Sequence, residues 1–184
     1  MNPLLEEIHL VEQQALLLHS EAEVEAALDR MASHINRTLS DSNLLLLCVI
    51  NGGIIAAGKL LPRLDFPLTL DSIHASRYRN ATSGSDLHWL YKPTTSLAGR
   101  SVLIVDDILD EGHTLQGIID YCLEQGAEQV FTAVLFDKQL DREKPVKPDF
   151  VGLTVANHYL FGYGMDYKGY LRNAPGVFAC KEVL

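Results

Sequence analysis

Residues 102–115 read Val-Leu-Ile-Val-Asp-Asp-Ile-Leu-Asp-Glu-Gly-His-Thr-Leu: an apolar run, two acids, an acidic turn with one glycine, and a threonine. The apolar run predicts a buried strand, and the amphipathic pattern that follows Thr114 predicts a helix. A helix that begins after a glycine turn binds anions, because its first N–H groups are free and its dipole is positive there. Gly112 permits the backbone conformation that such a turn requires. The stretch therefore predicts a strand–turn–helix unit with a phosphate site at the turn.

Carboxylates repel phosphate, so the acids beside this turn are expected to serve a purpose other than phosphate binding. Asp106, Asp107 and Asp110 suit ribose hydroxyls, a metal ion or a proton to be abstracted. The plainer alternative is a strand–turn–helix whose acids are solvated and whose threonine caps the helix. Two acids combined with an Asp-x-Gly-x-Thr turn favour the functional interpretation.

The flanking sequence predicts strands that alternate with helices. Continuous apolar runs predict strands over 44–50, 68–74, 101–105, 129–136 and 150–156. Helices are expected over the first forty residues, where Ser20 and Glu23 have capping-box spacing, over 54–61, and over 115–123, closed by Gly126. This alternation predicts an α/β domain with a mainly parallel sheet, whose ligands lie at the carboxyl ends of the strands. Residues 76–93 are polar and predict a mobile loop or lid.

Composition limits the partners of the chain. Its 184 residues suggest one domain, and a net charge of -9 argues against broad binding to nucleic acid or an anionic membrane. Cys48, Cys122 and Cys180 lack metal-type spacing and are expected to be reduced and mostly buried. The N-terminus has no signal-peptide pattern, and no apolar run approaches the ~20 residues that span a bilayer. A cytoplasmic location is the expectation.

The sequence resembles the type I phosphoribosyltransferases, whose PRPP-binding signature has the form of residues 102–115. The resemblance extends over nearly all of the chain from about Leu44. Residues 147–152 (Lys-Pro-Asp-Phe-Val-Gly) and 162–167 (Gly-Tyr-Gly-Met-Asp-Tyr) are similar to the hypoxanthine-guanine subgroup in particular. The resemblance implies one domain over 1–184: a mainly parallel sheet flanked by helices, with a small hood built from terminal segments. It divides into a PRPP-binding core over about 44–145, a lid over about 76–93, and a hood over about 146–184 with the N-terminal helices.

The resemblance also implies roles for individual residues at the PRPP site. Asp106 and Asp107 would hold the ribose 2′ and 3′ hydroxyls, and Asp110 would be the general base near N7 of the purine. The turn around the 5-phosphate and the contacts to pyrophosphate would be formed by Asp110, Glu111, Gly112, His113, Thr114, Asn51, Gly52 and Arg172.

At the purine site, the implied contacts come from the C-terminal third of the chain. Lys138 would donate to the purine O6, Tyr159 would stack on the base, and the backbone of Leu160 would read its edge. Asp166 would hold Mg²⁺ bound to pyrophosphate, with Asp106 and Asp107 as further candidate ligands. Ser76, Arg77 and Tyr78 would belong to the lid.

Each assignment has a plainer alternative, and the sequence departs from the family pattern in places. Lys138 could be a solvated lysine, Tyr159 a core residue, Asp166 a turn residue and Arg172 a surface ion-pair partner. Relatives often carry Thr or Ser where Glu111 stands, and Lys or Asn where His113 stands, so Glu111 is expected to point outward. The Ser-Tyr pair of the lid is interrupted by Arg77, and some relatives carry lysine at the position of Asn51.

The function implied is transfer of 5-phosphoribosyl from PRPP to hypoxanthine or guanine, with Mg²⁺, in a homodimer or homotetramer. One alternative is a non-catalytic regulator that senses PRPP or nucleotides on the same fold. A P-loop NTPase fits poorly, because Leu60 follows Gly58-Lys59 where a hydroxyl is required. A receiver domain fits poorly too, because its acid pair belongs near the N-terminus. The order of preference among hypoxanthine, guanine and xanthine is open.

Overall fold

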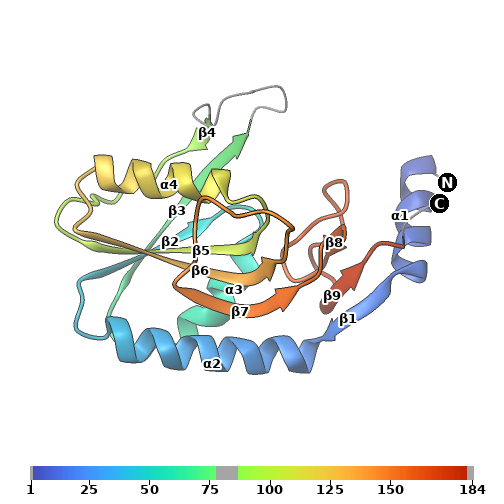
Figure 1. Ribbon diagram of the computed structural model, residues 1–184, viewed down its shortest axis with the longest axis horizontal. Coiled ribbons are helices and arrows are strands. Elements are labelled where there is room, and N and C mark those ends of the chain that lie inside the picture. Colours follow the sequence, from blue (N-terminus) through green and yellow to red (C-terminus); the bar gives the residue numbers. More distant parts are fainter. Residues whose placement is uncertain (1, 78–86, 182–184) are drawn as a thin grey trace.

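A six-stranded sheet forms the centre of the molecule, in a computed structural model that describes residues 2–77 and 87–181 (Figure 1). The strand order is β4-β3-β2-β5-β6-β7, and every neighbouring pair is parallel except β3 with β4. The strands are β2 (Leu44–Val49), β3 (Thr69–Arg77), β4 (Leu87–Tyr91), β5 (Ser101–Leu109), β6 (Gln129–Lys138) and β7 (Phe150–Val155). The predicted α/β class with a mainly parallel sheet is confirmed.

Helices cover both faces of this sheet, as the continuous apolar strands require. In β2, Leu44 and Leu46 pack toward α2 (Glu21–Leu39) and α3 (Ile54–Leu60). Leu45 and Leu47 point to the opposite face, toward α4 (His113–Glu124). Successive side chains of a strand point to opposite faces, so a strand between two helical layers is apolar at every position. A short 3-10 helix, η1 (Leu61–Arg63), continues α3.

A second, three-stranded sheet stands beside the first and joins the two ends of the chain. It has the order β1-β9-β8, with β1 (Leu16–Ser20), β9 (Gly176–Ala179) and β8 (Leu160–Phe161) paired antiparallel. Helix α1 (Pro3–Gln14) precedes it at the far end of the molecule (Figure 1). Like the implied hood, this sheet is built from terminal segments, but residues 150–155, which the implied hood included, form β7 of the main sheet.

Local signals predicted the main helices and the parallel strands, but they missed the four strands that pair antiparallel, β1, β4, β8 and β9. The first forty residues are not helical throughout, because Leu16–Ser20 is a strand that pairs with β9. The capping box at Ser20 and Glu23 and the positive φ of Gly126 after α4, 84°, are confirmed. Within the expected lid segment, residues 76–77 belong to β3 and residues 87–91 form β4. Residues 78–86, Tyr78 among them, lie outside the described residues.

All three cysteines are free thiols, and Cys48 and Cys122 are buried as predicted. Burial raises the pKa of the Cys122 thiol to about 12, so the thiol stays protonated. Within residues 2–77 and 87–181, no helix is both long and apolar enough to cross a membrane.

Candidate active site

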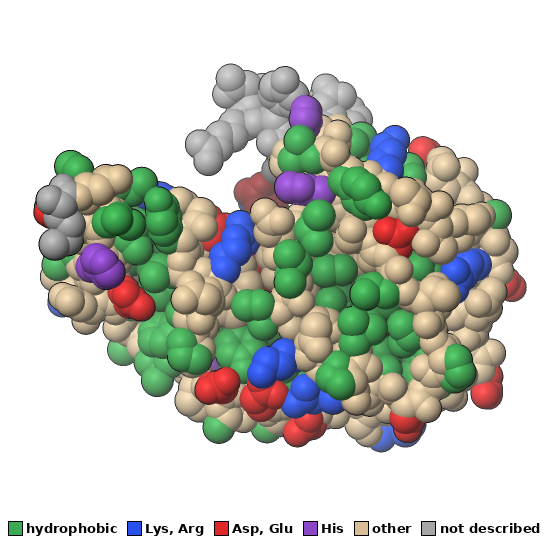
Figure 2. Space-filling view, turned by 180° about the vertical axis from the view of Figure 1, so that it is seen from behind, with side chains coloured by type: hydrophobic (Ala, Val, Ile, Leu, Met, Phe, Trp, Pro, Cys, Tyr) green, Lys and Arg blue, Asp and Glu red, His purple; other side chains and the backbone are tan. Residues whose placement is uncertain are grey.

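A cavity of about 620 Å³ opens where the carboxyl ends of the parallel strands face the small sheet. This is the edge at which ligands of parallel sheets bind. The surface is hollowed there, between the smaller lobe and the main body (Figure 2). The cavity is lined by Val49, Ile50, Asn51, Gly52, His74, Ala75, Asp106, Asp107, Ile108, Leu109, Asp110, Glu111, Gly112, His113, Thr114, Leu115, Lys138, Tyr159, Leu160, Met165, Asp166 and Arg172.

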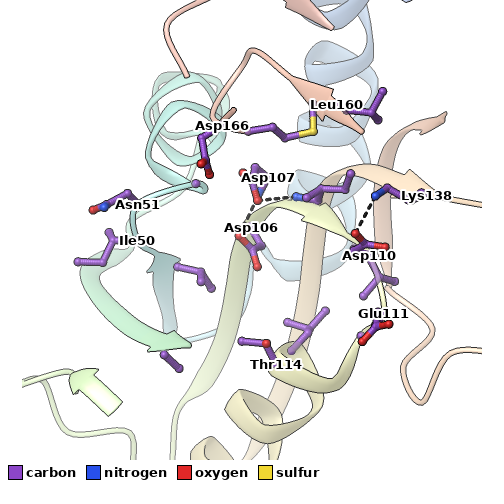
Figure 3. A pocket seen from close by; sticks show the side chains of 18 of the residues that line it. Ile50, Asn51, Asp106, Asp107, Asp110, Glu111, Thr114, Lys138, Leu160 and Asp166 are labelled. Atoms are coloured by element: carbon purple, nitrogen blue, oxygen red, sulfur yellow. Dashed lines mark hydrogen bonds and ion pairs between the residues drawn. The ribbon is translucent and has the colours of Figure 1, made fainter. Parts of the chain in front are cut away.

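The predicted anion turn lies in the wall of this cavity. Gly112 caps α4 with a left-handed φ of 86°, which an L side chain adopts only with strain. No side chain caps the helix, and its first backbone bond runs from the Gln116 N–H to the Gly112 carbonyl at 2.9 Å. The N–H groups of the first turn are therefore left for a ligand. Thr114 follows on the same turn (Figure 3).

Asp106 and Asp107 lie near the carboxyl end of β5 and line the cavity. The Asp107 carboxylate accepts the Ile108 N–H at 2.7 Å, and Asp106 accepts the Asp107 N–H at 2.9 Å (Figure 3). Burial raises the pKa of Asp106 well above its ordinary value, and repulsion from Asp107 adds to the rise. Burial likewise raises the pKa of Asp107. Burial of two neighbouring carboxylates disfavours their charged forms, so hydroxyl donors or a cation in the cavity would stabilise them.

Three chain segments meet around Asp107. A Cβ atom added to Gly52 would lie 2.2 Å from Asp107 Oδ2, and one added to Gly164 would lie 2.2 Å from the Gly52 carbonyl oxygen. The peptide bond between Ile50 and Asn51 is cis. The backbone contact leaves no room for side chains at the two glycines. It joins the Asn51–Gly52 loop to the segment that leads into Asp166.

Lys138 and Asp110 form an ion pair at the side of the cavity nearest the anion turn. Lys138 ends β6 and donates to Asp110 Oδ2 at 2.7 Å, although 28 residues separate them in the sequence (Figure 3). The Lys138 side chain is only 11% exposed, and that of Asp110 is 50% exposed. The alternative of a solvated lysine is therefore wrong, and the expected base and the expected O6 donor are neighbours.

Asp166 and Arg172 pair on the opposite wall. Arg172 contacts Asp166 Oδ1 at 2.6 Å and donates to the Gly164 carbonyl oxygen at 2.6 Å. Asp166 also accepts the Gly169 N–H at 2.7 Å, so it stabilises a turn as well as facing the cavity. Tyr159 is 57% exposed with its ring 5.5 Å from that of Tyr167, which excludes the alternative of a core residue.

The remaining predicted residues lie at the rim or outside the cavity. Glu111 lines the cavity and pairs with Arg142, which neutralises its charge beside the anion turn. His113, half-buried, begins α4. Ser76 lies in β3 opposite His88 and is not among the described residues that line the cavity. Arg77 ends β3, and Tyr78 falls outside the described part of the chain.

Sequence reasoning missed several apolar wall residues and one histidine. His74 lies near the carboxyl end of β3 and lines the cavity, although it has no motif around it. Ile108, Leu109 and Met165 also line the cavity. The rule that ligands bind at the carboxyl ends of parallel strands would have found His74, but not Met165, whose position depends on the loop between the sheets.

The carboxylates of the cavity suit a divalent ion that is shared with a substrate. Within the described chain, no three His, Cys, Asp or Glu residues converge as a closed metal site. Mg²⁺ is commonly held by one or two carboxylates, substrate phosphates and water, with no protein cage of its own. Asp106, Asp107 and Asp166 provide the hard oxygen donors that this mode requires.

Curated relatives match along most of the chain. The hypoxanthine-guanine phosphoribosyltransferase of Streptococcus pneumoniae (strain ATCC BAA-255 / R6) is 30% identical over 167 residues, covering 90% of this chain and 93% of that protein. The enzyme of the same name from Bacillus subtilis (strain 168) is 30% identical over 169 residues, covering 91% of this chain and 94% of that protein.

Solved structures share the fold. A hypoxanthine phosphoribosyltransferase from Staphylococcus aureus has a TM-score of 0.85 at 23% identity, with 90% of this chain and 91% of that chain covered. A hypoxanthine-guanine-xanthine phosphoribosyltransferase has a TM-score of 0.82 at 28% identity, covering 91% and 97%. The family described as "Phosphoribosyl transferase domain" matches residues 16–168. This chain, with its anion turn and acid pair at the carboxyl edge of a parallel sheet, belongs to the phosphoribosyltransferase family.

Proposed function

We propose that this protein is a purine salvage enzyme that transfers 5-phosphoribosyl from PRPP to hypoxanthine or guanine. The products are IMP or GMP and pyrophosphate. The observation that carries the proposal is the Lys138–Asp110 pair, which lines the same cavity as the anion turn and the exposed aromatic ring of Tyr159. The relatives named as hypoxanthine-guanine phosphoribosyltransferases support the same substrates. A non-catalytic regulator is not favoured, because those relatives match over nine-tenths of the chain.

The PRPP half of the reaction uses the anion turn and the acid pair. The N–H groups that begin α4 bind the 5-phosphate, and Asp106 and Asp107 accept hydrogen bonds from the ribose hydroxyls. Departure of pyrophosphate builds positive charge at C1, as in glycosyl transfer. Arg172, beside the Asn51–Gly52 loop, stabilises the negative charge that develops on the leaving group. The net charge of -9 opposes anion binding, so these local donors must supply the attraction.

The purine half uses the Lys138–Asp110 pair. The purine O6 accepts from the Lys138 ammonium, which then exchanges its bond to Asp110 for one to the base. The exchange leaves the Asp110 carboxylate free to take up the purine proton as a nitrogen attacks C1. Tyr159 covers one face of the base. Adenine presents donors at its 6-position and would leave the buried ammonium without an acceptor.

Mg²⁺ belongs to this proposal as a co-reactant. Asp166, with Asp106 and Asp107 as further donors, would hold the ion against PRPP and pyrophosphate. When bound, the ion supplies positive charge that offsets the leaving pyrophosphate. A homodimer or homotetramer in the cytoplasm, with no nucleic acid or membrane partner, remains the accompanying prediction. Light scattering on the purified protein tests the assembly.

A purine panel tests the proposed function directly. Purified protein with PRPP and Mg²⁺ is assayed for pyrophosphate release with hypoxanthine, guanine, xanthine, adenine, uracil and orotate. Hypoxanthine and guanine should turn over, and adenine should be poorer by roughly 10⁴ in kcat/KM, because its donors oppose Lys138. Comparable use of adenine would contradict the substrate assignment, and pyrophosphate release with none of the six would favour the regulator.

A further inference from the structure

The loop before Asp166 has a backbone that its own residues do not favour. Gly162, Tyr163 and Gly164 have successive positive φ values of 97°, 48° and 108°. Glycine adopts such angles freely, whereas tyrosine does so with strain. Tyr163 is one of three non-glycine residues with positive φ in the described chain. Contacts from elsewhere must therefore hold the loop in this shape.

Tyr163 makes such a contact at the back of the loop. Its side chain is buried, and its hydroxyl donates to Glu25 Oε1 at 2.7 Å, across 138 residues of sequence. Burial raises the pKa of the Tyr163 phenol, and the bond to Glu25 raises it further. The hydroxyl is therefore a permanent donor, and it ties the loop to helix α2.

The same carboxylate binds two cations that follow the Asn51–Gly52 loop. Lys59 Nζ, in α3, lies 2.7 Å from Glu25 Oε1, and Arg63, in η1, lies 2.5 Å from Oε2. These bonds, with that of Lys59 the largest contribution, lower the pKa of Glu25 to about 2. Helix α3 begins at Ile54, directly after the loop. Glu25 thus connects the segment that follows the Asn51–Gly52 loop with the segment that precedes Asp166.

These two segments also touch at the cavity. A Cβ on Gly164 would lie 2.2 Å from the Gly52 carbonyl oxygen, and the Gly164 carbonyl accepts from Arg172. The two loops are therefore in contact at the front and joined through a charged cluster at the back. Glu25, Lys59 and Tyr163 are not among the described residues that line the cavity, so they do not reach substrate.

We propose that Glu25 and Tyr163 are positioning residues that set the spacing between the Asn51–Gly52 loop and the loop of Gly164 and Asp166. That spacing determines how tightly the pyrophosphate group of PRPP is held. The inference rests on the proposed function, in which these two loops and Arg172 surround pyrophosphate. The purine end, at Lys138 and Tyr159, lies outside the cluster and should be unaffected.

Two variants test this role. Tyr163→Phe removes one hydroxyl and keeps the ring, and Glu25→Gln removes the charge that joins the two segments. Both should raise the KM for PRPP and the inhibition constant of pyrophosphate about three- to tenfold, the order expected for the loss of one typical hydrogen bond. The KM for hypoxanthine should stay within about twofold, since the base site is untouched.

Asp29→Asn is the matched control. It removes the 2.7 Å ion pair between Asp29 of α2 and Arg63 while leaving the bond between Glu25 and Tyr163 in place. The control should keep the wild-type KM for PRPP. Tyr163→Phe decides the outcome if Glu25→Gln fails to fold, because it changes a single atom.

Three results would overturn the inference: an unchanged KM for PRPP in folded Tyr163→Phe, an equal rise in the KM for hypoxanthine, or the same rise in Asp29→Asn. Calorimetric binding of pyrophosphate with Mg²⁺ to the wild type and Tyr163→Phe needs no turnover. A wild type without transferase activity would count against the proposed function. A pyrophosphate affinity equal in both proteins would count against the positioning role.

Discussion

In the proposed mechanism, Asp110 is the residue on which the chemical step depends most. Its carboxylate is half-exposed toward the cavity and paired with Lys138. A carboxylate in this position can accept the purine proton once O6 of the base accepts a hydrogen bond from the Lys138 ammonium. An amide in the same place has nearly the same shape but cannot take up a proton at neutral pH.

Asp110→Asn should lower kcat by roughly 10²–10⁴, the usual contribution of a positioned acid–base group. The KM for PRPP should change little, because in the proposed mechanism backbone N–H groups of the anion turn hold the phosphate. Steady-state kinetics with hypoxanthine provides the measurement, with Asp120→Asn on the exposed face of α4 as control. A kcat within threefold of wild type would remove Asp110 from the role of base.

Lys138→Met should narrow the preference for hypoxanthine over adenine by at least about tenfold in kcat/KM, since the donor to O6 is lost while the apolar stem is kept. Lys144→Met is a matched control. The Lys144 side chain is similarly shielded, at 12% exposed, and donates to Asp137 and the Leu109 carbonyl at 2.7 Å, but it does not line the cavity. Its loss should leave the ratio unchanged. If Lys138→Met also leaves it unchanged, another group reads the 6-position.

At the scale of elements, α2 contributes more than a cover for the sheet. Its apolar face packs on the sheet, while Glu25 bonds α3, η1 and the loop of Tyr163. The pKa of Glu25 lies near 2, below its ordinary value of 4.5. A carboxyl group with a lowered pKa stabilises the folded state above its unfolded value, and this contribution is lost as the pH falls toward the folded value.

The melting temperature of Glu25→Gln should therefore depend on pH less strongly than that of the wild type between about pH 2 and 4.5. Above pH ~5 the variant should melt at a lower temperature, because Lys59 and Arg63 lose a charged partner. As the pH falls from about 4.5 to about 2, the wild type should lose this advantage and the two melting curves should converge. Thermal unfolding followed by circular dichroism gives both curves. Glu124→Gln, an exposed change at the end of α4, should match the wild type throughout. A constant gap at every pH would show that Glu25 acts through packing alone.

At the scale of the whole molecule, the cavity is closed by parts that lie far apart in sequence. The main sheet contributes the acid pair and Lys138, and the anion turn follows its strand β5. The small sheet contributes Leu160, with Tyr159 directly before β8 and with Asp166 and Arg172 between β8 and β9. A ligand that binds the folded state across both parts stabilises it by an amount set by the ratio of ligand concentration to dissociation constant.

PRPP with Mg²⁺ should raise the melting temperature by about 5–10 °C at 100 times its dissociation constant. This follows from about 2.7 kcal/mol of binding and a shift of about 2–4 °C per kcal/mol for a chain of this size. In excess chelator the same PRPP concentration should give a smaller shift, and turnover should cease, because the carboxylates then face phosphate without a cation between them. Equal shifts and full activity in chelator would contradict the role of the metal.

Local sequence patterns determined the α/β class, the buried strands, the anion turn and the acid pair, because each depends on residues within one strand, turn or helix. The order of the strands in the sheet, and which side chains from distant segments pair with one another, depended on tertiary structure. The two-residue strand β8 and the four-residue strand β9 are too short to show a period, and β1 became a strand only by pairing with β9. The Lys138–Asp110 and Tyr163–Glu25 bonds join residues 28 and 138 positions apart. No pattern within a single segment specifies such pairs, since they form only when the packing of the two sheets brings their side chains together.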